Sequence, residues 1–599
     1  MFATWRKAMQ LLSARERRQG ALVLAMVMVM AVVEMAGVAS VMPFLAVLGN
    51  PDLVETNPVL ATLYSALGFT DTQTFLFALG IAAFCLVIGA AAVRTVTLYL
   101  IYRFTQMRRH SVGQKLLETY LRQPYAFFLQ RHTGDLAKGI LSEVDQLVEF
   151  VFRPAFEVIA YAVVVLAIVT LLVIVDPWLA LVVATVIGGL YGLTFLVIKG
   201  LLSHIGRDRA RANQERFTIA SEALGGIKSI KLLGRERAYL DRFRGPSVRQ
   251  ARHQATSRIL VDVPKYIVEA VGFGGVILLT LFLMATGGGL GEILPILGLY
   301  AFAGYRMMPA AQRIYGGIAK LRFGAAAVEG VHRDLYQRAS LAALPQREPP
   351  AMAPREQIHL RDLSFHYEGA EAPALEHIDL VIPVGSSVGL VGSTGAGKTT
   401  LVDVLLGLLR PDRGALVVDD VEIDDERLRA WQRALGYVPQ DIFLTDASVA
   451  ENIALGVPAD EVDHEQVKAC ARMAQVHDFV VGELPAGYAT QVGERGVRLS
   501  GGQRQRLGIA RALYHDPPVI VFDEATSALD NATEAAVMEA VDRLSTSKTI
   551  IMIAHRLTTV AGCDKIVLLD GGRIVDQGTA SDLAARSAYF RQLSAAADP

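Results

Sequence analysis

Cysteine is scarce in this sequence. Among 599 residues the only cysteines are Cys85, Cys470 and Cys563, which are widely spaced and form no Cys-x-x-Cys pair. This spacing favours neither a disulfide framework nor a zinc site. An excess of charge is also lacking, because 58 basic residues face 59 acidic ones. A chain with this balance gives no reason to expect a nucleic-acid partner.

We expect no cleavable signal peptide at the start of the sequence. The first 19 residues are basic but contain no small-residue cleavage site, so we expect the first apolar segment itself to direct membrane insertion. The composition is 52% hydrophobic and 20% charged, with a mean hydropathy of +0.36. Chain length suits two or three domains. The mixture predicts a membrane part joined to a soluble part.

Long apolar stretches are abundant in the first half. Each is longer than the roughly 20 residues that a helix needs to cross a bilayer. We therefore predict an all-α domain of six transmembrane helices. The stretches are Gly20–Leu48, Thr74–Tyr102, Phe152–Val175, Trp178–Ile198, Ile259–Ala285 and Leu290–Ile314.

Basic residues are distributed unevenly between the loops. Residues 50–73 contain no Lys or Arg, whereas the N-terminus and the long loops 103–149 and 199–258 are rich in both. The positive-inside rule therefore places the N-terminus, both long loops and everything after the sixth helix in the cytoplasm. The loop tips carry apolar residues, among them Phe127, Phe128 and Ile227, which require a partner surface.

The external loop contains the pattern of a short helix near residues 57–68. Asn57 suits the N-cap, Pro58 the first helical position and Gly68 the stop. Four apolar residues between them follow an i, i+3, i+4, i+7 spacing. We expect an amphipathic helix on the outer membrane surface, and an ordinary connector is the alternative. The four residues are Leu60, Leu63, Tyr64 and Leu67.

Charged residues inside the spans are costly and are usually functional or paired. Glu34 lies in the first span, Arg94 in the second, and Arg306 and Arg313 in the sixth or its extension. Guanidinium groups match phosphate well, so these arginines could line a cavity for a phosphate-bearing ligand. Alternatively they reach the membrane interface or pair with acids such as Glu34 or Glu269.

The second half begins after a proline-rich linker. We place the membrane domain at residues 1–338, the linker at 339–356 and a soluble domain at 357–599. In the soluble domain an apolar strand ends at a glycine-rich loop that opens a helix, which is the context of a P-loop. Its backbone amides cradle phosphates, Lys398 reaches the β- and γ-phosphates and Thr399 holds Mg²⁺. The predicted ATP-binding residues here are Gly392, Ser393, Thr394, Gly395, Ala396, Gly397, Lys398, Thr399 and Thr400.

Acidic residues follow a second apolar strand, Val519–Asp523. Asp523 is placed to bind Mg²⁺, and Glu524 can polarise the attacking water. His555 follows a third strand, at the edge where α/β sheets bind ligands. We therefore predict that Glu524 and His555 act in catalysis.

The motif Leu-Ser-Gly-Gly-Gln at residues 499–503 completes a set that resembles the nucleotide-binding domain of ATP-binding cassette (ABC) transporters, over Ile358 to Leu593. The resemblance implies that Tyr367 stacks on adenine, that Gln440 lies near Mg²⁺ and the attacking water, and that Asp530 belongs to the D-loop. It also implies that Ser500, Gly501, Gly502 and Gln503 contact ATP held by a second copy. The implied fold is an exporter-type helical membrane domain followed by an α/β P-loop domain with a helical subdomain. The implied working unit is a homodimer that hydrolyses ATP with Mg²⁺, and the loop tips correspond to coupling helices.

The membrane half narrows the resemblance. The segment from Glu34 to Phe44, the segment 50–57 with the helix after it, and Leu141–Asp145 are similar to the PglK-type bacterial flippases of lipid-linked oligosaccharides. This resemblance implies a polyprenyl-diphosphate-linked glycan as substrate, a role in protein glycosylation and a place in the bacterial inner membrane. It also implies that the external helix touches the lipid tail and that the arginines meet the diphosphate.

Three other interpretations were weighed. A multidrug, lipid A or other lipid exporter would share every nucleotide motif and have an apolar cavity. An ABC-type channel or regulatory receptor would use ATP for gating, against which the intact Glu524 and His555 argue. A soluble ATPase of DNA repair or translation shares the Leu-Ser-Gly-Gly-Gln motif but lacks the six spans.

Overall fold

The computed structural model describes residues 2–131, 133–175, 177–285, 290–336, 348–493, 496, 499–524, 534–539, 548–554 and 557–597. The chain divides into two compact units. Unit 1 comprises residues 1–123 and 130–342, and unit 2 comprises residues 124–129 and 343–599.

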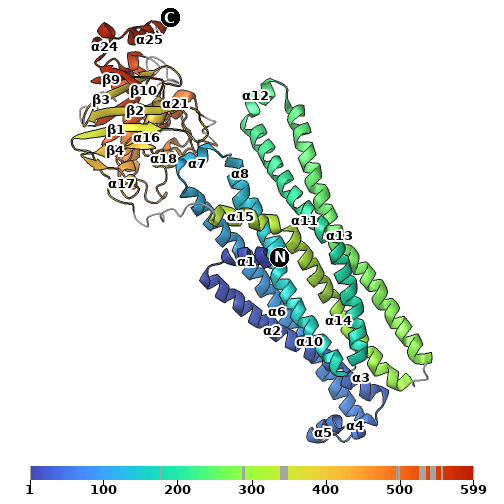
Figure 1. Ribbon diagram of the computed structural model, residues 1–599. Coiled ribbons are helices and arrows are strands. Elements are labelled where there is room, and N and C mark those ends of the chain that lie inside the picture. Colours follow the sequence, from blue (N-terminus) through green and yellow to red (C-terminus); the bar gives the residue numbers. More distant parts are fainter. Residues whose placement is uncertain are drawn as a thin grey trace. The chain divides into compact units, whose positions relative to one another are not determined.

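Unit 1 is built from helices alone in its described residues, several of them very long (Figure 1). Its first helices are α1 (Phe2–Gln10), α2 (Ala14–Ala39), α3 (Val41–Gly49), α4 (Leu53–Thr56), α5 (Pro58–Ala66) and α6 (Thr72–Leu121). A continuous helical stretch follows, made of α8 (Thr133–Lys138), a π-helical turn (Gly139–Glu143), α9 (Val144–Leu147), a second π-helical turn (Val148–Phe152) and α10 (Arg153–Val175). The remaining helices are α11 (Pro177–Gly225), α12 (Ile227–Leu232), α13 (Glu236–Ala285), α14 (Leu290–Phe323) and α15 (Ala325–Tyr336).

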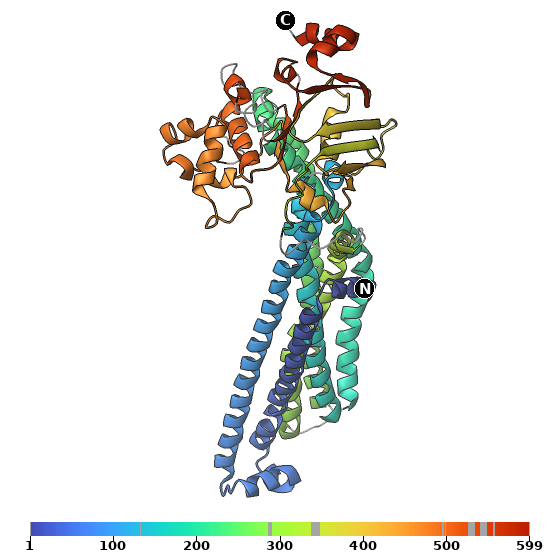
Figure 2. The ribbon, with the colours of Figure 1, turned by 90° about the vertical axis from the view of Figure 1, so that its left-hand side faces the viewer.

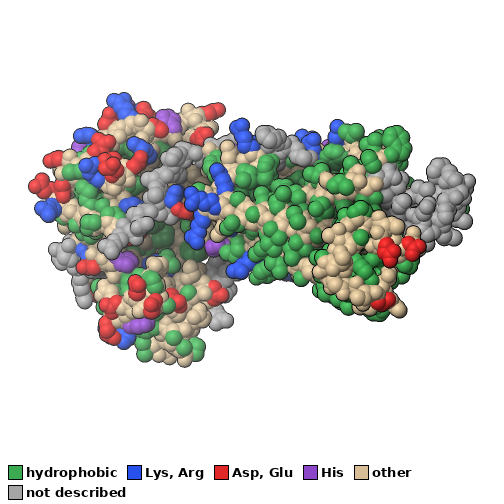
Figure 3. Space-filling view, turned by 90° about the horizontal axis from the view of Figure 1, so that it is seen from below, with side chains coloured by type: hydrophobic (Ala, Val, Ile, Leu, Met, Phe, Trp, Pro, Cys, Tyr) green, Lys and Arg blue, Asp and Glu red, His purple; other side chains and the backbone are tan. Residues whose placement is uncertain are grey.

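Helices lie at all six positions where the sequence predicts membrane spans. Among the described residues, four segments are long and apolar enough to cross a bilayer: Ala14–Gly49, Thr72–Leu121, Gly134–Val175 and Ala180–Gly225. The predicted fifth and sixth spans lie in α13 and α14, where many side chains are outside the described part. The long helices pair lengthwise, α2 with α6, α10 with α14 and α11 with α13. Figure 3 shows hydrophobic side chains spread over their surface, as a membrane-embedded unit requires.

The external segment contains α5, with the Asn57 side chain accepting hydrogen bonds from the N–H groups of Val59 and Leu60 at 3.0 and 3.3 Å. The four apolar residues of the expected face differ in burial and do not all face outward, which differs from the expectation. Leu60 is buried and Tyr64 packs with it in a cluster that includes Val47 and Phe75, from α3 and α6. The other two residues, Leu63 and Leu67, are exposed. Leu60 and Tyr64 pack against α3 and α6, so only Leu63 and Leu67 of the four remain exposed for contact with the membrane surface.

Unit 2 contains two sheets. An antiparallel sheet has the order β2-β1-β4-β5, and a larger sheet has the order β10-β9-β3-β8-β7-β6, parallel except for β10. The strands are β1 (Gln357–Phe365), β2 (Leu375–Pro383), β3 (Ser387–Gly392), β4 (Arg413–Val418), β5 (Val421–Glu422), β6 (Leu435–Val438), β7 (Val519–Asp523), β8 (Thr549–Ile553), β9 (Lys565–Asp570) and β10 (Arg573–Gly578). Strands β7 and β8 are buried at every position. Continuous burial is expected for parallel strands covered on both faces, and it fixes the acids at the ends of these strands.

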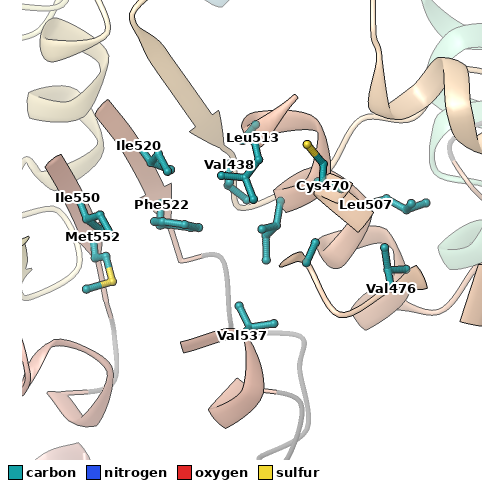
Figure 4. Packing of buried hydrophobic residues seen from close by; sticks show 14 of the residues in the cluster. Val438, Cys470, Val476, Leu507, Leu513, Ile520, Phe522, Val537, Ile550 and Met552 are labelled. Atoms are coloured by element: carbon teal, nitrogen blue, oxygen red, sulfur yellow. The ribbon is translucent and has the colours of Figure 1, made fainter. Parts of the chain in front are cut away.

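Helices surround these sheets and form a separate subdomain. The helices of unit 2 are α7 (Tyr125–Leu129), α16 (Lys398–Leu405), α17 (Leu428–Gln432), α18 (Val449–Ile453), α19 (His464–Met473), α20 (His477–Gly482), a 3₁₀ turn (Gly487–Ala489), α21 (Gly501–Leu513), α23 (Leu557–Val560), α24 (Ala580–Arg586) and α25 (Ala588–Ala597). In Figure 2 the orange helices of the subdomain gather on one side of unit 2. Figure 4 shows their joint core with the sheet, where strand residues such as Ile520 and Phe522 pack with helix residues such as Cys470 and Leu507.

The tip of the first long loop is helix α7. This segment belongs to unit 2, where Ala126 packs against the core of the strands around the P-loop. The tip of the second long loop is α12 in unit 1, where Ile227, Leu232 and Leu233 are exposed. Both apolar tips form short helices.

Candidate nucleotide-hydrolysis site

The phosphate-binding loop joins β3 to α16 through glycines that nothing larger could replace. A Cβ atom on Gly392 would lie 2.2 Å from the carbonyl oxygen of Leu569. Gly395 and Gly397 have φ angles of 83° and 97°, a region that residues with a Cβ rarely adopt. The loop therefore turns tightly and presents its amides at the start of α16, the arrangement that binds phosphate oxygens.

Lys398, the first residue of α16, folds over this loop. Its Nζ donates to the carbonyls of Gly392 at 2.8 Å and Ser393 at 3.0 Å. Burial lowers the pKa of Lys398, while the nearby Glu524 and Asp523 act in the opposite direction. The two carboxylates favour the charged form of Lys398. Its positive charge lies beside the loop and would neutralise charge on a bound phosphate.

Next to Lys398, residues Thr399 and Thr400 differ in environment. The Thr399 side chain is exposed, so its hydroxyl is accessible to a metal ion. Thr400 is buried, and its hydroxyl lies 3.1 Å from the hydroxyl of Tyr367. The Tyr367 ring is 37% exposed and stands edge-on to Phe365. The Tyr367 ring is thus held by Phe365 and, through its hydroxyl, by Thr400, beside the phosphate-binding loop.

Asp523, at the end of β7, is buried and held by its neighbours. Its Oδ2 accepts a hydrogen bond from the Tyr437 hydroxyl at 3.2 Å. Burial first, and then Asp523 and Asp403, raise the pKa of Tyr437, so its hydroxyl stays protonated and remains a donor. A carboxylate and the Thr399 hydroxyl are the oxygen ligands that Mg²⁺ prefers, so this donor set fits Mg²⁺.

Asp403 on α16 is a second buried carboxyl near Asp523. Burial, and secondarily the charge of Asp523, raises the pKa of Asp403 to about 6. Two acids in such proximity disfavour ionisation of both at once. A cation at Asp523 would relieve this repulsion.

Glu524 is held at each of its polar groups. Its N–H donates to Ile553 O at 3.1 Å, its carbonyl accepts from Gln505 Nε2 at 3.3 Å, and its Oε2 accepts from Gln440 Nε2 at 2.6 Å. The φ angle of Glu524 is 52°, a left-handed conformation that costs roughly 1–3 kcal/mol and needs such support. The structure thus brings Gln440, Asp523 and Glu524 together at one edge of the sheet, as the sequence predicts.

The Leu-Ser-Gly-Gly-Gln segment forms the N-terminus of α21. Ser500 is the N-cap, and it exchanges hydrogen bonds with Gln503 in a capping box. The N–H of Gln503 donates to Ser500 Oγ at 3.2 Å, and the N–H of Ser500 donates to Gln503 Oε1 at 2.8 Å. Gly501 and Gly502 then form a first turn without side chains. An exposed helix N-terminus of this kind is suited to approach an anion.

Two predicted residues lie outside the described part of the chain, His555 and Asp530. Three residues that the sequence reasoning did not single out join the site, Tyr437, Gln505 and Asp403. Tyr437 and Gln505 stand two or three residues from the predicted Gln440 and Gln503, so proximity in sequence was the available signal. Asp403, a charge within the apolar helix after the P-loop, was a visible anomaly.

Unit 1 brings several charged residues of the spans together. Arg94 lies 3.6 Å from the buried Glu34, and Arg313 lies 3.9 Å from the buried Glu157. The Arg313 guanidinium lies 5.2 Å from the centre of the Tyr161 ring, and the two ion pairs are together called the charged cluster. The arginine side chains remain 42% and 45% exposed. The alternative expectation was that the arginines pair with acids such as Glu34 or Glu269: Arg94 does lie beside Glu34, Arg313 lies beside Glu157, and Glu269 lies 3.7 Å from Lys265.

The side chain of Arg306 lies outside the described part, so its place relative to this cluster is left as predicted. Glu157 was missed, although it stands four residues from Arg153 and Tyr161 in an apolar run. The ion pair between Arg153 and Glu157, at 3.3 Å, uses that i, i+4 spacing.

A separate cavity of about 500 Å³ lies between α10, α11 and α14. It is apolar, and neither Arg94 nor Arg313 lines it. Gly188 and Gly192, one turn apart on α11, leave its wall open. Its other lining residues include Val165, Met307, Ile314 and Tyr315.

Comparisons with known proteins agree with both units. A model of the ABC transporter transmembrane region matches residues 22–262, and a model of the ABC transporter matches residues 375–527. The chain is 31% identical over 492 residues to the heterocyst differentiation ATP-binding protein HepA of Nostoc sp., covering 80% of this chain and 78% of the relative. It is 30% identical over 578 residues to the ATP-dependent lipid A-core flippase of Bordetella pertussis, covering 94% and 88%. Its fold is similar to that of a bacterial Atm1-family ABC exporter with ATP bound, with a TM-score of 0.78, 24% identity and coverage of 98% and 99%.

Proposed function

Since this chain belongs to the ABC transporter family, as a half-transporter of the exporter type, we propose that it moves a lipid-linked oligosaccharide across a membrane. An ABC exporter is an ATP hydrolase that works with ATP and Mg²⁺. The proposed substrate is a glycan on polyprenyl diphosphate, which would serve protein glycosylation. The proposed place is the bacterial inner membrane, with the N-terminus and unit 2 in the cytoplasm.

The charged cluster of unit 1 carries this proposal. Arg94 and Arg313 are half-exposed, and each is tied to a buried glutamate on a neighbouring helix. The glutamates hold the guanidinium groups in place while leaving part of each accessible. A diphosphate offers several oxygens to such groups, and paired N–H donors recognise them with directionality. Arg306, on the same helix as Arg313, is proposed to join them.

The external helix is the proposed contact for the lipid tail. Val59 and Leu63 on α5 and Leu67 at its C-cap are exposed, at a spacing of four residues. This outward stripe is apolar and could lie in the membrane surface. Leu60 and Tyr64 would anchor α5 to α3 and α6, since they pack with Val47 and Phe75.

We further propose that two copies form a homodimer with two composite sites. Two ATP molecules would bind between P-loops and the Ser500–Gln503 segments of opposite copies and close the dimer. The loop tips at α7 and α12 would transmit the closure to the spans, and hydrolysis with Glu524 as base would reopen it. Ligand binding of this kind shifts a population between two states.

A second candidate is export of another lipid, such as lipid A. The apolar cavity between α10, α11 and α14 favours this candidate, because neither Arg94 nor Arg313 lines it. The chain's similarity to a lipid A-core flippase also supports it. Both candidates share the ATP mechanism and differ in the headgroup.

Transport in proteoliposomes tests the proposal. Wild type, Glu524→Gln and an Arg94/Arg306/Arg313 alanine set are compared for ATP-dependent flipping of polyprenyl-diphosphate glycans and of lipid A. Arg237→Ala, at an exposed residue near the start of α13, is the matched control. We expect glycan flipping by wild type and the control, and loss in the arginine set. Flipping of lipid A alone by wild type would refute the substrate, and full glycan flipping by the arginine set would refute the site.

A further inference from the structure

The C-terminal helix α25 reaches the phosphate-binding loop through one side chain, Tyr589. The N–H of Ser393 donates to the Tyr589 hydroxyl at 3.0 Å, and this hydroxyl donates to the carbonyl of Leu569 at 3.4 Å. A phenol that accepts one hydrogen bond and donates another is fixed in orientation. Tyr589 therefore joins the start of the loop to the end of β9.

Ser393 connects this contact to the phosphate-binding lysine. While its N–H donates to Tyr589, its carbonyl accepts from Lys398 Nζ at 3.0 Å and from the N–H of Ala396 at 3.1 Å. The two peptide groups flank one Cα atom, so the backbone angles of Ser393 set both directions together. Restraining the N–H thus restrains the carbonyl that holds Lys398.

The last part of the chain supports the loop at further points. The carbonyl of Leu569 closes on Gly392, where a Cβ would come within 2.2 Å of it. The N–H of Gly572, in the turn after β9, donates to the carbonyl of Ala396 at 3.2 Å. Phe590, next to Tyr589, is buried in the core of unit 2 and anchors α25. Tyr589 thus lies next to the buried residue that anchors its helix.

We propose that Tyr589 is a positioning residue for ATP binding, acting through Ser393 on the conformation of the loop and on Lys398. It touches neither the nucleotide nor the reacting atoms. Its hydroxyl holds the loop in the shape that accepts phosphates, so its loss weakens ATP binding and leaves the hydrolysis step nearly unchanged. The C-terminal helix is in this way part of the nucleotide site.

Tyr589→Phe tests this, because it keeps the ring and removes only the hydroxyl. The full-length protein in detergent or nanodiscs is titrated with ATP for Kd, and steady-state hydrolysis gives KM and kcat. We expect Kd and KM for ATP to rise about three- to tenfold, the effect of losing one hydrogen bond, with kcat within about twofold.

Tyr514→Phe is the matched control. The Tyr514 hydroxyl also accepts a backbone N–H, that of Asp463 at 3.0 Å, in the helical subdomain. It removes the same kind of bond without touching the P-loop, so Kd and KM should match wild type even where thermal stability falls. An unchanged Kd in Tyr589→Phe, or an equal rise in Tyr514→Phe, would overturn the proposal.

Discussion

Gln440 Nε2 lies 2.6 Å from Glu524 Oε2, so the loop after β6 holds the carboxylate that follows β7. An amide that donates to one carboxylate oxygen orients the other toward its target. From this pairing we expect Glu524 to polarise the attacking water molecule beside Asp523. The two residues are 84 positions apart in the sequence.

Glu524→Gln tests the role of that carboxylate. Removal of a general base costs about 10²–10⁴-fold in rate, so we expect kcat to fall by at least about 100-fold while ATP still binds. Phosphate release and ATP titration of the full-length protein measure the two quantities. Glu483→Gln, an exposed residue of the helical subdomain, should keep wild-type activity. Residual activity above about a tenth would contradict the assignment.

Gln505 links the Leu-Ser-Gly-Gly-Gln helix to the backbone of Glu524. Its buried Nε2 donates to the Glu524 carbonyl and so supports the left-handed conformation. We expect Gln505→Leu to lower kcat about tenfold with little change in the KM for ATP, because the loss of this support misplaces the carboxylate.

Gln466→Leu provides the comparison for Gln505. Its Nε2 also donates to a backbone carbonyl, that of Tyr514 at 3.2 Å, away from Glu524. Kinetics of both variants on the full-length protein decide the point. Equal losses of kcat in the two variants would mean that Gln505 acts only through general stability.

We expect Tyr437 to affect how tightly the site binds Mg²⁺. Its hydroxyl donates to Asp523 and fixes the carboxylate in the orientation available to the metal. Loss of a residue that hydrogen-bonds a metal ligand typically weakens metal binding about 10–100-fold, so Tyr437→Phe should raise the Mg²⁺ concentration for half-maximal hydrolysis by about tenfold. A Mg²⁺ titration at saturating ATP measures this. An unchanged midpoint would show that Asp523 needs no such support.

The relative positions of the described motif residues of the nucleotide site follow largely from chain order. A strand that ends at Gly392 and a helix that begins at Lys398 can place their amides in only one way. Likewise Asp523 ends and Glu524 follows a fully buried strand, whose neighbours are parallel and end at the same edge. The order of strand, loop and helix along the chain is therefore enough to place these residues at one edge of the sheet.

The supporting contacts could not be predicted, because they join residues far apart in the chain. Tyr589 and Ser393 are 196 positions apart in the sequence, and no periodicity or spacing predicts the hydrogen bond between them. The division of the external helix has the same cause. Its i, i+3, i+4, i+7 pattern gave one face, but the packing of Leu60 against Phe75 of α6 is a tertiary event.

Asp403 predicts a pH dependence of stability. Its pKa is raised from 3.8 to about 6 by burial and the neighbouring Asp523. Below about pH 4 the carboxyl is protonated in both states and there is no penalty. Between about pH 4 and 6 the unfolded carboxyl ionises first, so folding stability falls as pH rises, and above pH 6 the penalty is constant at roughly 1–3 kcal/mol.

Asp403→Asn should remove this penalty. Thermal unfolding of the nucleotide-free protein should show a gain of several degrees at about pH 7.5 that shrinks as the pH falls toward 4. Asp460→Asn, an exposed substitution in the helical subdomain, should give no gain at either pH. A gain that is independent of pH would attribute the effect to packing.

A mixed dimer tests whether Ser500 serves the nucleotide of the other copy. Chains with Lys398→Ala or Ser500→Arg should each form inactive homodimers. In the heterodimer, one site combines both defects and the other combines the intact P-loop of one copy with the intact Ser500 of its partner. Two-fold symmetry then predicts about half of wild-type hydrolysis, measured after purification on two different affinity tags. If Ser500 acted on the nucleotide of its own copy, each site of the heterodimer would carry one defect and hydrolysis would be lost. The restored activity therefore separates a site shared between copies from one that a single copy completes.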